Sequence, residues 1–252
     1  MTMNTLNRPT WERVIFALDV GDGIEEALSW VDRLKGHVGL FKVGKESFVR
    51  YGPEIVRLIH VRGGKVFLDL KFHDIPNTVA RAGEAAFALG VAMFNLHALG
   101  GGQMMQETVK GVQRLAEQSG KPEPIILAVT VLTSLDDEDL RRMGFSRGAR
   151  ETALTLARIA QDAGVAGVVA SAEDAAAIRL ACGSEFLIVT PGIRGGKAVA
   201  GDDQKRIVGP CDAVQYGSDF LVVGRPIRQA ADPAGEADQI AGEIARGLSL
   251  RG

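Results

Sequence analysis

Eight short, mostly apolar runs recur along the chain, and each is followed by a segment with helical spacing or by a loop that carries one. The runs span residues 14–20, 40–46, 65–71, 93–99, 124–132, 167–171, 186–193 and 220–227. Near-continuous Val, Ile, Leu and Phe is typical of strands covered on both faces, as in parallel sheets. Eight strand–helix units with right-handed connections close into a barrel. The sequence therefore predicts an α/β fold, a (β/α)8 TIM barrel.

The intervening segments support one continuous domain. Residues 77–90 and 149–164 are rich in Ala with interspersed Glu and Arg, and Gly90 and Gly164 stand where helix C-caps are expected. No linker or low-complexity tract divides the chain, so we expect a single domain over residues 1–252. A doubly wound sheet is the competing fold. Its phosphate-binding signature is represented only by GDG at 21–23, which lacks the third glycine.

Composition excludes several classes of function. The net charge of -2 gives no electrostatic case for binding nucleic acid or an anionic membrane. No window approaches the roughly 18 to 20 apolar residues of a membrane span, and the first residues lack the apolar core of a signal peptide. The two cysteines, Cys182 and Cys211, fit neither a disulfide framework nor a metal site, so we expect buried thiols. We expect a cytoplasmic protein.

Polar residues cluster at the carboxyl ends of the predicted strands, where barrel enzymes place their active sites. In chain order they are Asp19, Lys42, Asp69, Lys71, Asp74, Asn95, His97, Thr133, Ser134, Ser171, Arg194, Gly224 and Arg225. Every predicted strand contributes at least one of them. We therefore expect these residues to meet on one rim of the barrel.

The stretch VFLDLKFHDIPNTV, residues 66–79, is the most informative part of that rim. Side chains alternate along a strand, so Asp69 and Lys71 should point the same way, and Lys42 on the neighbouring strand can lie beside them. Asp74 comes after the strand, and Pro76 fits the first turn of a helix. A structural ion-pair network would use the same residues, but four charges converging from two adjacent strands favour a functional site.

The last two strands indicate a phosphate-bearing substrate. Barrels frequently bind phosphate with the loops after strands seven and eight. Here those loops contain GIRGG at 192–196 and VGRPI at 223–227. Glycine lets the backbone approach an anion closely, and Arg225 is able to clamp it in a bidentate manner. Ordinary tight turns would explain the glycines alone. We expect a small phosphate ester.

The motifs together resemble orotidine 5'-phosphate decarboxylases of the compact bacterial type. They are FALD (16–19), FKVG (41–44), LDLKFHDIPNT (68–78), VLTS (131–134), TPGIR (190–194), GDDQKR (201–206) and VVGRPI (222–227), in family order over nearly the whole chain. The resemblance implies a barrel that converts orotidine 5'-monophosphate to uridine 5'-monophosphate, the last step of de novo pyrimidine nucleotide synthesis. It also implies a homodimer that uses no metal or organic cofactor.

Roles for single residues follow from the same resemblance. Lys42, Asp69, Lys71 and Asp74 match the family's alternating charge network, with Lys71 as the proton donor and Asp74 lent across the dimer interface. The resemblance assigns the substrate contacts to Asp19, Lys42, Ile75, Thr78, Thr133, Pro191, Arg194, Gln204, Gly224 and Arg225. Among these, Asp19 binds the ribose, Thr133 lies beside the base, and Arg194, Gln204, Gly224 and Arg225 hold the phosphate and close a loop over it.

Two other functions use the same residues. The first is a metal-dependent sugar-phosphate lyase or isomerase on a related barrel, with the acidic residues of 69–74 as metal ligands. The second is a catalytically inactive regulator that binds a phosphosugar. His73 and His97 are able to act as acid–base groups, but we expect both to make structural hydrogen bonds.

Overall fold

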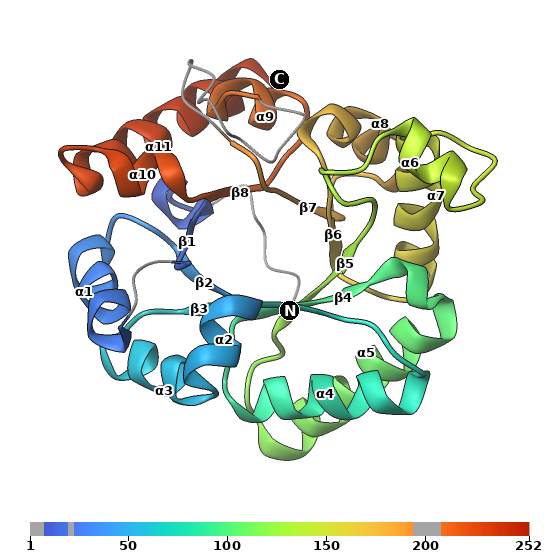
Figure 1. Ribbon diagram of the computed structural model, residues 1–252, viewed down its shortest axis with the longest axis horizontal. Coiled ribbons are helices and arrows are strands. Elements are labelled where there is room, and N and C mark those ends of the chain that lie inside the picture. The colour runs from blue at the N-terminus through green and yellow to red at the C-terminus, as the bar shows by residue number, and fades with distance from the viewer. Residues whose placement is uncertain (1–7, 20–22, 194–207, 252) are drawn as a thin grey trace.

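A computed structural model describes residues 8–19, 23–193 and 208–251 of the protein. In these ranges eight parallel strands form a closed barrel in the order β1 to β8, with β1 paired to β8. The helices form a ring outside the strands (Figure 1). The predicted (β/α)8 barrel is therefore confirmed, and the doubly wound sheet is wrong.

Seven strands are shorter than the apolar runs that predicted them, and β3 has the length of its run but is shifted by one residue. Their bounds are β1 Val14–Ala17, β2 Leu40–Gly44, β3 Val66–Phe72, β4 Met93–His97, β5 Ile125–Val129, β6 Gly167–Val169, β7 Leu187–Thr190 and β8 Phe220–Val223. Most runs continue past the carboxyl end of the strand into the following loop or into the first residues of the next helix.

The helices occupy the predicted positions. The α-helices are α1 Ile24–Leu34, α2 Lys45–Tyr51, α3 Glu54–Val61, α4 Pro76–Ala88, α5 Gly102–Ser119, α6 Asp137–Arg142, α7 Ala149–Asp162, α8 Ala172–Cys182, α9 Pro210–Gln215, α10 Arg225–Gln229 and α11 Pro233–Leu250, and two 3-10 turns are η2 Thr10–Arg13 and η3 Ala98–Gly100. Gly90 and Gly164 follow α4 and α7 with φ of 75° and 79°, the left-handed conformation expected of a C-cap glycine. Within the described ranges, no helix is long and apolar enough to cross a bilayer.

Two apolar clusters hold the barrel together. The larger one lies between the strands and the helices and includes Phe16, Phe41 and Phe94. The smaller one fills the barrel interior and includes Leu40, Phe67 and Met93 on three neighbouring strands. Because side chains alternate along a strand, the residue two positions after each interior residue also faces inward. These next positions hold Lys42, Asp69 and Asn95, so the interior becomes polar toward the carboxyl end.

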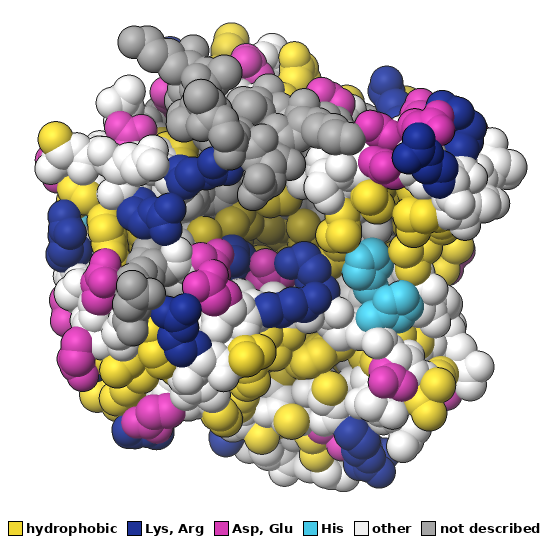
Figure 2. All heavy atoms as spheres, in the orientation of Figure 1, with side chains coloured by type: hydrophobic (Ala, Val, Ile, Leu, Met, Phe, Trp, Pro, Cys, Tyr) yellow, Lys and Arg dark blue, Asp and Glu magenta, His cyan; other side chains and the backbone are white. Residues whose placement is uncertain are grey.

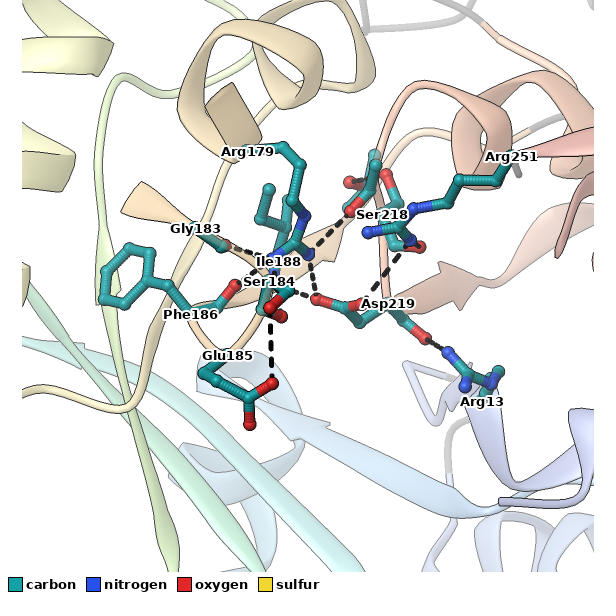
Figure 3. A network of polar contacts seen from close by, with 12 residues as sticks. Arg13, Arg179, Gly183, Ser184, Glu185, Phe186, Ile188, Ser218, Asp219 and Arg251 are labelled. Carbon is teal, nitrogen blue, oxygen red and sulfur yellow. Dashed lines mark hydrogen bonds and ion pairs between the residues drawn. The ribbon is translucent and has the colours of Figure 1, made fainter. Parts of the chain in front are cut away.

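A second charged cluster lies at the opposite, amino-terminal end of β7 and β8 (Figure 3). Asp219 immediately precedes β8, and its Oδ2 accepts hydrogen bonds from Nη2 of Arg179 (2.6 Å) and from the backbone N–H of Ile188 (2.9 Å). Arg251 Nη1 lies 3.6 Å from its Oδ1. Arg13 Nη1 donates to its backbone oxygen at 3.3 Å. These contacts tie helices α8 and α11 to the base of the barrel.

The thiols are as expected. Cys182 and Cys211 are both free and buried. They form no disulfide, and their position supports the assignment as packed side chains.

Candidate active site

A cavity of about 530 Å³ opens at the carboxyl ends of the strands. It is lined by Ala17, Asp19, Lys42, Glu46, Phe67, Asp69, Lys71, Val129, Val131, Leu132, Thr133, Val169, Ala170, Pro191, Gly192, Val222, Gly224, Arg225 and Arg228. Figure 2 shows this face, with basic and acidic side chains gathered around a central hollow that has apolar walls. A hollow with apolar walls and a few convergent charges is the usual form of a small-molecule site.

Four charged residues of the cavity alternate in sign along a continuous chain of contacts. Asp19, just after β1, accepts a hydrogen bond from Lys42 Nζ at 2.8 Å. Lys42 Nζ also lies 3.5 Å from Oδ2 of Asp69. The other oxygen of Asp69, Oδ1, lies 2.7 Å from Lys71 Nζ. The structure therefore brings together the predicted Lys42, Asp69 and Lys71, and adds Asp19 to the same network.

The environment of Lys42 keeps it charged. Burial alone would lower the pKa of its ammonium, but the carboxylates of Asp69 and Asp19 outweigh burial, so the pKa of Lys42 is raised. A protonated Lys42 attracts Asp19 on one side and Asp69 on the other. The network is thus a line of charges of alternating sign.

Lys71 has an unusual backbone. Its φ is 52°, and among the described residues it is the one non-glycine residue with a positive φ. The pairing of β3 with β4 shifts register between Leu68 and Phe72. Such a conformation costs roughly 1–3 kcal/mol for a non-glycine residue and is concentrated at functional sites. The side chains of Lys71 and Asp69 were expected to point the same way, and they are in contact.

The Lys71 backbone is held by Asn95 on β4. Its Oδ1 accepts the hydrogen bond of the Lys71 backbone N–H at 2.8 Å, and its Nδ2 donates to Oδ1 of Asp69 at 2.6 Å. Asn95 is fully buried. Sequence reasoning placed it on the rim but assigned no role to it.

Three predicted site residues lie outside the cavity of this chain. Asp74, Ile75 and Thr78 are all exposed, and the carboxylate of Asp74 accepts a hydrogen bond from the backbone N–H of Ile75 at 2.6 Å. Ile75 is 66% exposed, which is high for an apolar side chain. Helix α4 begins at Pro76, as predicted. A single chain therefore does not bring Asp74 to Lys71.

The predicted phosphate-binding residues are partly described, and Gly224 and Arg225 line the cavity. Thr133 and Pro191, which were predicted as other substrate contacts, line it as well. A Cβ at Gly224 would lie 3.3 Å from the Cβ of Ala17, so this turn is close to the neighbouring strand end. Arg194 and Gln204, together with the glycines at 195 and 196, lie outside the described residues.

Two polar lining residues were missed by sequence reasoning. Arg228 lies one helical turn after Arg225 on α10, and its Nη1 donates to the backbone oxygen of Asp19 at 2.8 Å. Glu46 lies in α2, directly after β2. Arg228 could have been predicted from its spacing to Arg225, because residues three apart on a helix share a face.

His73 and His97 stack on each other, with ring centroids 5.4 Å apart and an angle of 26° between the planes. Burial, together with the positive charges of His73, Lys71 and Lys45, lowers the pKa of His97 to about 4. The buried Nδ1 of His97 has no hydrogen-bond partner in the described part of the chain. The expected structural hydrogen bond is therefore not made by Nδ1 of His97, and the ring packs against His73.

Two carboxylates of the cavity, Asp19 and Asp69, are paired with lysine side chains. Within the described ranges, no group of three or more His, Cys, Asp and Glu side chains is arranged to hold a metal ion. Asp19 and Asp69 each contact a lysine ammonium, which occupies the position that a cation would take. The donor set thus fits an organic anion better than a metal.

Comparisons with known proteins agree with each other. A sequence model of the orotidine 5'-phosphate decarboxylase / HUMPS family matches residues 12–240. Orotidine 5'-phosphate decarboxylase of Syntrophus aciditrophicus (strain SB) is 61% identical over 251 residues, covering 100% of both chains. The enzyme of that name from Syntrophotalea carbinolica is 51% identical over 94% of this chain and 96% of its own. The crystal structure of orotidine 5'-phosphate decarboxylase from Lactobacillus acidophilus matches with a TM-score of 0.80 at 37% identity, covering 92% of this chain and 98% of that one.

Proposed function

The chain belongs to the orotidine 5'-phosphate decarboxylase / HUMPS family, and from that premise we propose that it converts orotidine 5'-monophosphate to uridine 5'-monophosphate and carbon dioxide. This is the last step of de novo pyrimidine nucleotide synthesis. The observation that carries the proposal is the alternating line Asp19, Lys42, Asp69 and Lys71 at the bottom of a cavity large enough for a nucleotide. Identity over full length to an enzyme of that name supports it.

The reaction poses an electrostatic problem. When the carbon–carbon bond to the carboxylate breaks, carbon dioxide leaves without the electron pair, which stays on the ring carbon in the ring plane. The ring offers no carbonyl positioned to delocalise that pair. A fixed ammonium facing this carbon would stabilise the charge as it develops, and preorganised charges of this kind are a large source of rate enhancement.

Lys71 is the residue proposed for that task. Its ammonium lines the cavity and is held by Asp69 at 2.7 Å. Lys71 then gives one proton to the ring carbon, which completes the uridine base, and regains a proton from water. Asp69 and Lys42 keep the ammonium in one place, so little reorganisation is needed during the reaction. The proposed chemistry uses no metal and no organic cofactor.

The rest of the cavity is proposed to bind the nucleotide. Asp19, fixed by Lys42, would accept hydrogen bonds from the ribose, and Thr133 and Pro191 would lie beside the base. Arg225 and the backbone at Gly224 would hold the phosphate. We also propose that Arg194 and Gln204, outside the described residues, contact the phosphate and close over it. Phosphate binding far from the reacting carbon can help to lower the barrier by driving such closure.

A homodimer is part of the proposal. Asp74, Ile75 and Thr78 are exposed beside the cavity mouth of their own chain, and Asp74 does not reach Lys71. These positions support a site completed by a second copy, in which each Asp74 serves the partner's cavity. The proposal also includes a single barrel domain over residues 1–252 and a cytoplasmic location.

A spectrophotometric assay tests the activity directly. The purified protein should consume orotidine 5'-monophosphate with the absorbance change of decarboxylation, and stoichiometric uridine 5'-monophosphate should appear by chromatography. Absence of turnover would overturn the proposal and leave the inactive phosphosugar-binding regulator.

The same assay after extensive treatment with EDTA addresses the metal-dependent alternative. Full activity is expected, because the proposed steps use only the ammonium of Lys71 and its neighbours. A loss of activity that is restored by a divalent metal would favour the metal-dependent lyase or isomerase.

A further inference from the structure

Asn95 does not line the cavity, yet its side chain contacts two residues of the proposed site. Its amide oxygen accepts the hydrogen bond of the Lys71 backbone N–H at 2.8 Å. Its amide nitrogen donates to Oδ1 of Asp69 at 2.6 Å. That same carboxylate oxygen receives the ammonium of Lys71 at 2.7 Å. The contacts form a closed ring that links the backbone of Lys71, the amide of Asn95, the carboxylate of Asp69 and the ammonium of Lys71.

The amide can have only one orientation in this ring. A backbone N–H only donates, so it must face the amide oxygen, and a carboxylate only accepts, so it must face the amide nitrogen. Rotating the amide by half a turn would place two donors together and two acceptors together. Asn95 is fully buried, so no solvent would relieve either conflict. An asparagine at this position is thus matched to both neighbours at once.

The same hydrogen bonds account for the backbone conformation of Lys71. The pairing of β3 with β4 loses its register between Leu68 and Phe72. The N–H of Lys71 bonds the side chain of Asn95, and the φ of Lys71 is 52°. A bulge of this kind re-aims a side chain beside an active site. The backbone N–H of Lys71 is partly buried and needs a partner, and here the amide provides it.

We propose that Asn95 is a positioning residue for the decarboxylation, acting through Lys71 and Asp69. Its oxygen keeps Lys71 in the left-handed conformation that directs the ammonium toward the cavity. Its nitrogen keeps the Asp69 carboxylate turned toward that ammonium. This inference rests on the proposed function for its kinetic consequences, but its geometric part stands without it.

The first test is Asn95→Leu, which keeps the size of the side chain and removes both hydrogen bonds. A displaced ammonium should lower kcat by about 100-fold, the scale expected of a misplaced reacting group. KM should change by less than about threefold, because the variant touches no substrate-binding group. The matched control is Thr130→Val, a buried polar side chain that follows β5 and bonds only the backbone oxygen of Val169. Its kcat should stay within about twofold of wild type.

The second test is Asn95→Asp, read as a pH profile of kcat. The introduced carboxyl has the shape of the amide. When protonated, it accepts from the Lys71 N–H and donates to Asp69, as asparagine does. When ionised, it faces Asp69 as a like charge. Among the described residues, the introduced carboxyl would also bond the backbone of Lys71, with Lys42 on the far side of Asp69 and His97 two residues further along β4.

Activity of this variant should therefore rise as pH falls over a range in which wild-type kcat is flat. A group with only a structural role would not add a new titration to kcat. A pH profile parallel to that of wild type would overturn the inference. So would an Asn95→Leu enzyme with wild-type kcat. If Asn95→Leu does not fold, the Asn95→Asp profile decides.

A crystal structure of Asn95→Leu separates this inference from the proposed function. We expect Lys71 to leave the positive φ region and its ammonium to move away from Asp69. If wild-type protein shows no decarboxylase activity, the proposed function is wrong. The crystal structure then remains the test of whether Asn95 positions Lys71. An unchanged Lys71 in that structure would refute the positioning role, whatever the activity of the wild type.

Discussion

Lys71 Nζ lies 2.7 Å from Oδ1 of Asp69, and a single residue separates the two in the sequence. In a regular strand two such residues share a face about 6.6 Å apart along the chain. Here the φ of 52° at Lys71 and the register shift of β3 alter the path between them. The short contact places one carboxylate directly against the ammonium that is proposed to act.

Lys71→Ala should lower kcat by more than about 10,000-fold, because the ammonium is proposed both to stabilise the developing charge and to supply the proton. Far-ultraviolet circular dichroism should show an intact barrel. Lys65→Ala is the matched control, since Lys65 is exposed and precedes the opposite end of the same strand. Turnover by the Lys71 variant close to that of the control would remove Lys71 from the mechanism.

Mixing two inactive variants should restore activity if the site is shared between subunits. A dimer of Lys71→Ala with Asp74→Ala carries one site in which both residues are native. After complete exchange half of the dimers are mixed, so about one quarter of wild-type activity is expected. Exchange is verified by native mass spectrometry of differently tagged chains. Complete exchange with no regain of activity would show that Asp74 does not act across an interface.

Arg225→Ala should raise KM for orotidine 5'-monophosphate by about 10- to 100-fold, the value of a charge-assisted hydrogen bond to phosphate. The substrate that lacks phosphate, orotidine, provides the control. Wild type and variant should process orotidine with the same kcat/KM, because the missing contact has no partner there. An equal loss on both substrates would indicate that Arg225 acts elsewhere in the cavity.

His97 should make the fold less stable in acid. Its pKa is about 4 in the folded protein, against 6.5 for an ordinary histidine, because burial and nearby positive charge disfavour protonation. Between these values the unfolded chain binds more protons, so the free energy of unfolding falls as pH drops from 6.5 toward 4. Above pH 6.5 this contribution is fully present.

The test compares wild type with His97→Phe, which keeps a ring against His73 without a titratable group. Between pH 7 and pH 4.5 the wild type should lose about 1–2 kcal/mol more than the variant, allowing for partial exposure of the ring. Urea denaturation at one fixed protein concentration measures both. Equal losses would mean that His97 protonates freely in the folded state.

Asp219→Ala should lower the free energy of unfolding by about 2–3 kcal/mol, because it removes the buried carboxylate that pairs with the half-buried guanidinium of Arg179. KM and kcat should not change at temperatures where the variant is folded, since Asp219 precedes the amino end of β8 and the cavity lies at the carboxyl ends of the strands. Asp32→Ala removes an exposed pair with Arg62 and should cost less than about 1 kcal/mol. A similar cost for both variants would contradict the structural role of the buried cluster.

Local patterns in the sequence predicted the scaffold and much of the site. The continuous apolar runs and the capping glycines at 90 and 164 indicated buried strands and helix ends, because both signals are written in consecutive residues. Closure into a barrel followed from the number of units. Lys42, Asp69 and Lys71 could be placed on one rim because parallel strands present their carboxyl ends on the same side.

Contacts between strands decided the rest. The bond from Asn95 to Lys71, the left-handed backbone of Lys71 and the reach of Arg228 to Asp19 all depend on which residues of separate strands and helices lie opposite each other. The position of Asp74, exposed and directed to its own neighbour, also follows from the path of the chain after β3. The sequence by itself determined the barrel and the residues at its mouth, since apolar periodicity and strand polarity act over a few residues. Only the tertiary structure decided how those residues are oriented, because hydrogen bonds between distant segments set the register and the backbone angles that aim each side chain.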